Sequence, residues 1–119
     1  MDWIDFYRES YPMAGEEIII KHRPDSFLGT NLKEKLEEKS VDAFVVCGMM
    51  THMCIDTTVR AAGNYGYSVT LIEDACATRD LVWGGITVLA EQVQTAYMAA
   101  LDGTFARVLK ADAWIKEHK

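Results

Sequence analysis

Short apolar runs alternate with helical patterns along this chain, and that alternation constrains its fold more than any other feature. Apolar and β-branched runs, typical of strands buried on both faces, cover 17–21, 41–48, 68–73 and 105–109. Amphipathic patterns that indicate helices cover 31–39, about 52–65, 87–101 and 111–119. The remaining stretches, expected to be loops, include 1–16, 22–29 and 74–85. Because strands that alternate with helices pair in parallel, the sequence predicts an α/β domain with a mostly parallel sheet and helices on both faces.

The size and charge of the chain argue against several classes of protein. Its 119 residues suit a single domain over 1–119. The net charge of −6 argues against nucleic acid and anionic membranes as partners, since both require clustered Lys and Arg. No apolar run approaches the roughly 20 residues needed to cross a bilayer. The first residues also lack the layout of a signal peptide.

The cysteines point to a reducing compartment. Cys47, Cys54 and Cys76 are an odd number at irregular spacing, which is a poor framework for disulfides. None of them belongs to a C-x-x-C pair of the kind that binds zinc. We therefore expect free thiols and a cytoplasmic protein.

Cys54 is the residue that says most about chemistry. It follows an apolar run at 43–47 and a tight stretch at 48–53, and a helical pattern comes after it. This order predicts a thiol in the first turn of a helix, at the carboxyl end of a buried strand. Unpaired backbone N–H groups and the helix dipole favour negative charge there, which biases a thiol toward thiolate. A thiolate with N–H donors beside it is a nucleophile with a ready oxyanion site.

Two further polar residues lie at predicted strand ends, where ligands bind in parallel sheets. Lys21 ends the first predicted strand and Asp74 follows the third. Each candidate also has a simpler interpretation. Cys54 can be a buried small hydrophobe, Lys21 a solvated strand end, and Asp74 a cap for the loop that leads to Thr78. Residue types alone leave these alternatives open.

Three segments, in order, resemble a known family. Residues 45–58, VVCGMMTHMCIDTT, are similar to the nucleophile region of the isochorismatase-like cysteine hydrolases, which include nicotinamidases and N-carbamoylsarcosine amidase. Residues 20–32, which contain Lys21, resemble that family's lysine segment, and residues 61–78 resemble its next strand and loop. The likeness extends over about residues 15–110, which is most of the chain.

The resemblance implies a three-layer, doubly wound isochorismatase-like fold and a Cys–Lys–Asp triad. Cys54 would be the nucleophile and Lys21 the triad lysine. A non-proline cis peptide is implied between Met49 and Met50, so that the backbone N–H groups of Met50 and Cys54 face a developing oxyanion. No cofactor is implied. No metal site is expected either, because the family's metal-binding members carry their ligands in a segment without a counterpart here.

The triad aspartate has no clear counterpart in the sequence. In the family it ends a first strand, whereas Asp2 and Asp5 lie in a segment without a buried-strand pattern. The chain is therefore interpreted as N-terminally truncated, the C-terminal portion of the family's domain. Two alternatives stay open: the sheet has closed up, or another chain fills the gap. If the family's sheet order of 3-2-1-4-5-6 applies, the missing strands belong in the middle of the sheet. An edge left open in this way favours association into a homo-oligomer.

The predicted function is that of a cysteine hydrolase acting on the C–N bond of a small amide or ureido substrate through a thioester acyl-enzyme. Several side chains are candidates for lining the substrate pocket, although core packing explains most of them equally well: Phe27, Met49, Met50, Thr51, Met53 and Trp83.

Two other functions are left open. One is a catalytically impaired remnant or subunit of the family that acts through assembly. The other is an unrelated thiol hydrolase in which His22 or His52 serves as the base. The spacing argues against His52 as the base, because it precedes Cys54 by only two residues and side chains at that spacing do not face each other on a helix.

Overall fold

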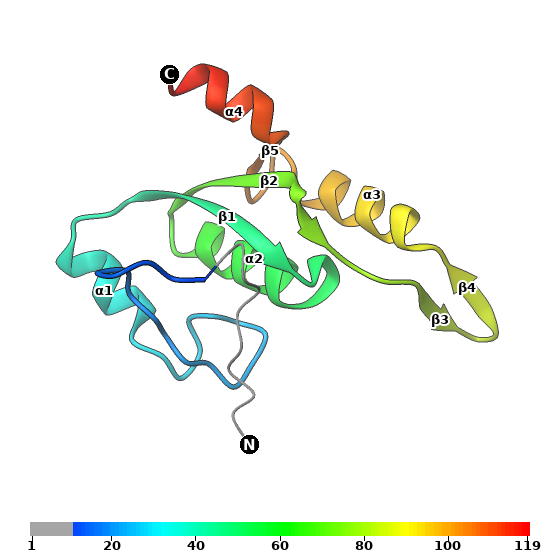
Figure 1. Cartoon of the computed structure of the whole chain (residues 1–119). Coiled ribbons are helices and arrows are strands. Elements are labelled where there is room, and N and C mark those ends of the chain that lie inside the picture. Colours follow the sequence, from blue (N-terminus) through cyan, green and yellow to red (C-terminus); the bar gives the residue numbers. More distant parts are fainter. Residues whose placement is uncertain (1–10) are drawn as a thin grey trace.

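The sheet of the protein consists of three parallel strands, which a computed structural model describes within residues 11–119. β1 (Ala43–Met49) lies at one edge, β2 (Ser68–Ala77) in the middle and β5 (Arg107–Leu109) at the other edge. β3 (Leu81–Trp83) and β4 (Ile86–Val88) form a separate antiparallel hairpin (Figure 1).

Helices connect these strands. α1 (Leu32–Glu38) precedes β1, and a π-helical turn, η2 (Thr51–Ile55), continues into α2 (Asp56–Asn64) between β1 and β2. α3 (Ala90–Leu101) leads from the hairpin to β5, and α4 (Ala111–Glu117) follows β5. None of the helices within residues 11–119 has the length and apolar character required to span a membrane.

The core lies between the sheet and helices α2 and α3. Val69 and Leu71, two residues apart on β2, point to this side and are 4% and 0% exposed. They belong to one buried cluster with Val59 and Ala62 of α2 and Leu101 of α3. The alternation along β2 therefore fixes which face of the sheet these two helices cover.

The opposite face of the sheet carries α4. Val45, Thr70 and Arg107 point to this side, and together with Trp114 of α4 they line a shallow hollow. Arg107 is also tied to α4 by a two-pronged ion pair with Glu117. The protein thus has a parallel sheet with helices on both faces, which confirms the predicted α/β architecture.

The predicted strand at 17–21 is wrong. The segment is coil, and Ile18 and Ile20 are 55% and 53% exposed. Within residues 11–119 no strand pairs with the outer edge of β1, so this β-branched run has no neighbouring strand to complete its backbone hydrogen bonds. Composition favours a strand only where a partner is present.

Other boundaries also differ from the predictions. β2 continues to Ala77 and the hairpin occupies 81–88, where the sequence analysis predicts a loop over 74–85. The helix expected from Thr87 begins at Ala90, because β4 occupies the residues before it. Asn31 and Glu34 have the spacing of a capping box, yet the side chain of Asn31 makes no capping hydrogen bond at the start of α1.

Leu71 offers a direct test of this core. Leu71→Ala is expected to lower the free energy of unfolding by roughly 2–5 kcal/mol, because it removes a fully buried side chain and leaves a cavity. Val45→Ala is the matched control: Val45 lies in the same sheet but is 44% exposed on the other face, so its loss should cost under about 1 kcal/mol. Urea denaturation followed by circular dichroism measures both, and equal losses would contradict the assigned faces.

Candidate active site

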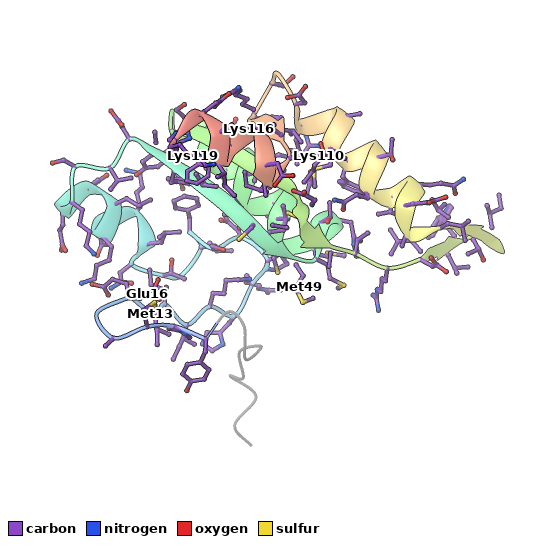
Figure 2. The ribbon with its side chains drawn as sticks, turned by 45° about the horizontal axis from the view of Figure 1, so that its top comes forward. Met13, Glu16, Met49, Lys110, Lys116 and Lys119 are labelled. Atoms are coloured by element: carbon purple, nitrogen blue, oxygen red, sulfur yellow. The ribbon has the colours of Figure 1, made fainter. Side chains whose placement is uncertain are left out.

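The turn from β1 into η2 has an unusual backbone that sets the position of Cys54. The β1–β2 register shifts between Val46 and Gly48. Gly48 has φ +133°, a conformation that side chains rarely adopt. The next peptide bond, Met49–Met50, is cis, as the resemblance implies. Met49 marks this carboxyl end of β1 in Figure 2. Cys54 follows within η2 and is half-buried, so the predicted thiol in the first helical turn after the strand is confirmed.

Lys21 is in direct contact with this thiol. Its Nζ lies 3.2 Å from Cys54 Sγ, although 33 positions separate the two residues along the chain. The same ammonium donates to the carbonyl of Arg23 at 2.8 Å and is 3.4 Å from that of Pro24. The structure therefore brings together the two side chains that the sequence analysis proposes as a pair, and the two carbonyls aim the ammonium at the sulfur.

Thr58 holds the segment that carries this lysine. Thr58 follows Cys54 by four residues, so both side chains lie on the same side of the helix. Its Oγ1 accepts a hydrogen bond from the backbone N–H of Ser26 at 3.0 Å. The same oxygen lies 3.2 Å from the Pro24 carbonyl and 2.9 Å from Ser26 Oγ. A single buried hydroxyl thus fixes the loop at 24–26, which supplies one of the carbonyls that hold Lys21.

Sequence reasoning did not identify Thr58. A threonine in a helix is common, and its type carries no functional signature. The usable signal is its spacing, one helical turn after the candidate nucleophile. Because residues 17–21 do not form a strand, the hydrogen bonds of the Thr58 hydroxyl to Pro24 and Ser26 anchor the segment that follows Lys21.

The anchoring by Thr58 is testable. Thr58→Val should slow alkylation of Cys54 about fivefold, because a lost hydrogen bond is worth roughly 1 kcal/mol and a looser loop holds Lys21 less firmly. Thr58→Ser keeps the hydroxyl and should restore the rate. Thr57→Val, on the neighbouring helix position, is the control. If Thr58→Val folds and reacts like the control, the anchoring role is wrong.

The turn itself is tied to the rest of the fold by Thr51. This residue has no exposed surface, and its Oγ1 donates to Gln94 Oε1 at 2.7 Å and lies 3.3 Å from the Ala77 carbonyl. The Gln94 side chain in turn donates to the carbonyl of Glu73 at 2.8 Å. Thr51 therefore connects η2 to β2 and α3, which makes it a structural residue in the present arrangement.

The other pocket candidates lie in three places: beside the turn, in the core and on the hairpin. Met49 and Met53 are 47% and 46% exposed, at the surface beside the turn, and Met50 is half-buried. Phe27 instead lies in the core at 7% exposure, with its ring centroid 5.2 Å from that of Tyr65. For Phe27 the contacts are those of the core-packing alternative. Trp83 lies on the hairpin and is 87% exposed.

His52 is not oriented toward the thiol. Its Nδ1 lies 2.8 Å from Thr78 Oγ1, and its ring is adjacent to that of Tyr97. Its Nε2 is buried and has no hydrogen-bond partner in the described part of the chain. The ring thus links η2 to the segment after β2, and its contacts give no support to a Cys54–His52 pair.

The sequence offers no clear carboxylate for the third position of the implied Cys–Lys–Asp triad. Asp2 and Asp5 lie outside the described residues. Over 11–119, neither Lys21 nor Cys54 has a carboxylate partner, and no group of three potential metal ligands is present. Asp74 accepts the backbone N–H of Ala111 at 2.8 Å, so it caps α4 rather than the loop to Thr78.

Burial affects the thiol of Cys76, a third cysteine. It raises the pKa of the Cys76 thiol to about 11, and the thiol donates to the carbonyl of Ile72 at 3.3 Å. Cys47 is exposed on β1, and both remain free thiols, as predicted. A thiol with so high a pKa stays protonated at neutral pH and reacts slowly.

Alkylation should distinguish the three cysteines. With iodoacetamide at neutral pH, Cys54 and the exposed Cys47 should be modified, while Cys76 stays unmodified until the pH approaches its pKa of about 11. Peptide mass mapping across a pH series measures this. Labelling of Cys76 as fast as that of Cys47 at neutral pH would contradict the assignment.

A comparison with known protein families agrees with this geometry. A family model described as the isochorismatase domain matches residues 2–113. The chain belongs to the isochorismatase family.

Relatives and solved structures lie within the same family. The isochorismatase family protein YddQ of Bacillus subtilis is 46% identical over 113 residues, which are 95% of this chain and 63% of that protein. The crystal structure of an isochorismatase from Pseudomonas putida matches with a TM-score of 0.89 and 39% identity, covering 92% of this chain and 56% of the other. These matches confirm the predicted isochorismatase-like fold. The chain spans roughly half to two-thirds of the length of such relatives.

Some relatives carry names that state an activity. Nicotinamidase 3 of Arabidopsis thaliana is 38% identical over 63 residues, which are 53% of this chain and 32% of that protein. Streptothricin hydrolase of Streptomyces noursei is 36% identical over 70 residues, 59% of this chain and 25% of that protein. A structure described as a cysteine hydrolase, from Pseudomonas syringae, matches with a TM-score of 0.90 and 27% identity, covering 95% of this chain and 54% of the other. The family is therefore one of hydrolases.

Proposed function

We propose that this hydrolase-family chain uses Cys54 to cleave the C–N bond of a small amide or ureido substrate. The observation that carries the proposal is the contact between Lys21 Nζ and Cys54 Sγ at 3.2 Å, at the start of a helix. An ammonium that donates to sulfur stabilises negative charge on it, and so do the backbone N–H groups of a first helical turn. Together they favour the nucleophilic form of the thiol.

The reaction would proceed in two steps. The Cys54 sulfur attacks the carbonyl carbon, the C–N bond breaks, and the nitrogen leaves as ammonia or an amine after taking up a proton. Water then attacks the thioester and releases the acid and the thiol. The backbone N–H groups of Met50 and Cys54 would hold the oxyanion in both steps, each contributing about 3–4 kcal/mol to the transition state.

A general base completes this mechanism. Within residues 11–119 no carboxylate contacts Lys21 or Cys54, so a carboxylate base would come from outside these residues. Acid–base assistance is typically worth about 10²–10⁴-fold in rate. With a general base the enzyme would turn over rapidly, whereas without one the thiol would react with substrate or reagent but turnover would be slow. Two relatives support the proposal by their names, a nicotinamidase and a streptothricin hydrolase.

Turnover gives the decisive test. The chain should release ammonia from at least one member of a panel of small primary amides and ureido compounds that includes nicotinamide. Cys54→Ala should abolish this release, and Lys21→Met should reduce it by about 10²-fold or more, because the charge beside the sulfur is lost. Cys47→Ala is the control, since this exposed thiol of β1 is not part of the contact between Lys21 and Cys54 and its loss should leave the rate unchanged.

A second candidate function is favoured by the open edge of the sheet. β1 has one strand partner, β2, within residues 11–119, and its other edge is unpaired there. A family member without a general base of its own could act as a subunit in an assembly. If no substrate in the panel is turned over while the thiol remains reactive, the result supports this second function and contradicts the hydrolase proposal.

A further inference from the structure

A hollow with aromatic side chains in its wall lies between η2, β3 and α3. Its volume is about 530 Å³, and its lining includes His52, Met53, Arg79, Asp80, Trp83 and Tyr97. Pockets that bind small molecules are on the order of 300–1,000 Å³. β3 and α3 lie at the end of the sheet at which β2 leads into the hairpin (Figure 1). Neither Lys21 nor Cys54 is among the described residues that line it, so this surface is separate from the candidate active site.

Arg79 supplies this hollow with a positive charge that the protein does not neutralise. The residue is exposed, and its side chain makes no hydrogen bond or ion pair with the part of the chain that the structure describes. A guanidinium is a planar fork of N–H donors that fits the two oxygens of a carboxylate. Arg79 is therefore available to bind an anion.

The negative charge in the same hollow is already engaged. Asp80 Oδ1 accepts the backbone N–H of Ala90 at 2.7 Å, and Ala90 is the first residue of α3. A carboxylate at the start of a helix is stabilised by the helix dipole. Because Asp80 is used in this way, Arg79 decides the sign of the charge that the hollow accepts.

Aromatic rings and a thioether provide the apolar part of the wall. Trp83 is 87% exposed, and Tyr97 is half-buried with its ring centroid 6.4 Å from that of His52. Met53 is 46% exposed, and the sulfur of a methionine makes favourable contacts with aromatic rings. Indole and phenol rings hold a flat ring by offset stacking or by edge-to-face contact. The wall therefore favours a planar aromatic group over an aliphatic one.

His52 adds a hydrogen-bonding group that the protein leaves unused. Its Nδ1 lies 2.8 Å from Thr78 Oγ1, whereas its Nε2 is buried without a hydrogen-bond partner among the described residues. Buried polar atoms are rarely left unpaired, so a ring of this kind in the wall of a hollow favours a bound ligand.

The hollow on the opposite face of the sheet contains similar residue types in a different state. It is lined by Arg107, Trp114 and His118, among others. There both terminal nitrogens of Arg107 donate to Glu117, and the rings of Trp114 and His118 stack on each other with centroids 4.3 Å apart. In that hollow the charge and the rings have partners within the protein, whereas Arg79 and Trp83 are open to a ligand.

We infer that the hollow between η2, β3 and α3 binds a small planar aromatic acid. The carboxylate of the acid accepts hydrogen bonds from Arg79, and its ring contacts Trp83 and Tyr97. Benzoate, a flat ring with one carboxylate, is the simplest probe of this class. A ligand of so few atoms is expected to bind with a dissociation constant of about 1 mM.

A nuclear magnetic resonance titration of the isotopically labelled full chain tests the site. It uses Cys54→Ala, which leaves every ligand chemically intact. Benzoate should shift the indole N–H signal of Trp83 and leave that of Trp114 unchanged. Benzamide lacks the charge and should bind about 10-fold more weakly, and cyclohexanecarboxylate lacks the flat ring and should bind about 3-fold more weakly.

A matched pair of substitutions tests the role of the charge. In the same background, Arg79→Gln should weaken benzoate binding by about 10-fold or more, because charge-assisted hydrogen bonds are lost. Lys110→Gln is the control: it removes the same charge from an exposed residue just before α4 and should leave the affinity unchanged. All variants should have the circular dichroism of the wild-type chain.

Four results would each overturn the inference. They are no shift of the Trp83 signal up to about 20-fold above the expected dissociation constant, equal shifts of Trp83 and Trp114, equal affinity for benzamide and benzoate, and equal affinity in Arg79→Gln and Lys110→Gln. Because the titration is done without the Cys54 thiol, the inference and the proposed function fail separately.

Discussion

The arrangement of the candidate site depends on one contact, between the Lys21 ammonium and the Cys54 sulfur at 3.2 Å. It joins a coil segment outside the sheet to the first turn of a helix that follows β1. β1 is an edge strand without a buried residue, contrary to the buried strand that the sequence predicts. The carbonyls of Arg23 and Pro24 orient the ammonium, and Thr58 fixes the loop that contains Pro24. A charge beside a thiol changes its chemistry only if its position is maintained, so these backbone contacts are part of the site.

The sulfur is positioned by a different set of constraints. Gly48 takes a backbone conformation with φ +133°, the Met49–Met50 peptide is cis, and η2 begins immediately afterwards. Thr51 ties this turn to Ala77 and Gln94, in other words to the extended end of β2 and to α3. The thiol is thus positioned by the sheet and the lysine by the loop, and the two meet at the carboxyl end of β1. This is the edge at which open parallel sheets bind ligands.

Much of this could be predicted from the sequence, and the exceptions have physical causes. The strand–turn–helix pattern around Cys54 is local, so the position of the thiol follows from residues 43–65 alone. The partnership with Lys21 came from the family resemblance, because no local pattern links residues so far apart. The strand at 17–21 was wrong because β-branched residues cannot form a strand without a neighbour. The hairpin was missed although Gly84-Gly85 between two apolar triplets is a hairpin signal. The only sequence signal for Thr58 is its spacing, one helical turn after Cys54, since its role depends on a loop that packs on it from elsewhere.

The central claim is that contact with the Lys21 ammonium makes the Cys54 thiol reactive. The most direct measurement is the rate of alkylation by iodoacetamide at neutral pH in a chain whose only cysteine is Cys54, made by Cys47→Ala and Cys76→Ala. The account predicts that this rate falls markedly when Lys21→Met is added. An equal rate with and without Lys21, in chains with the same circular dichroism, would contradict it.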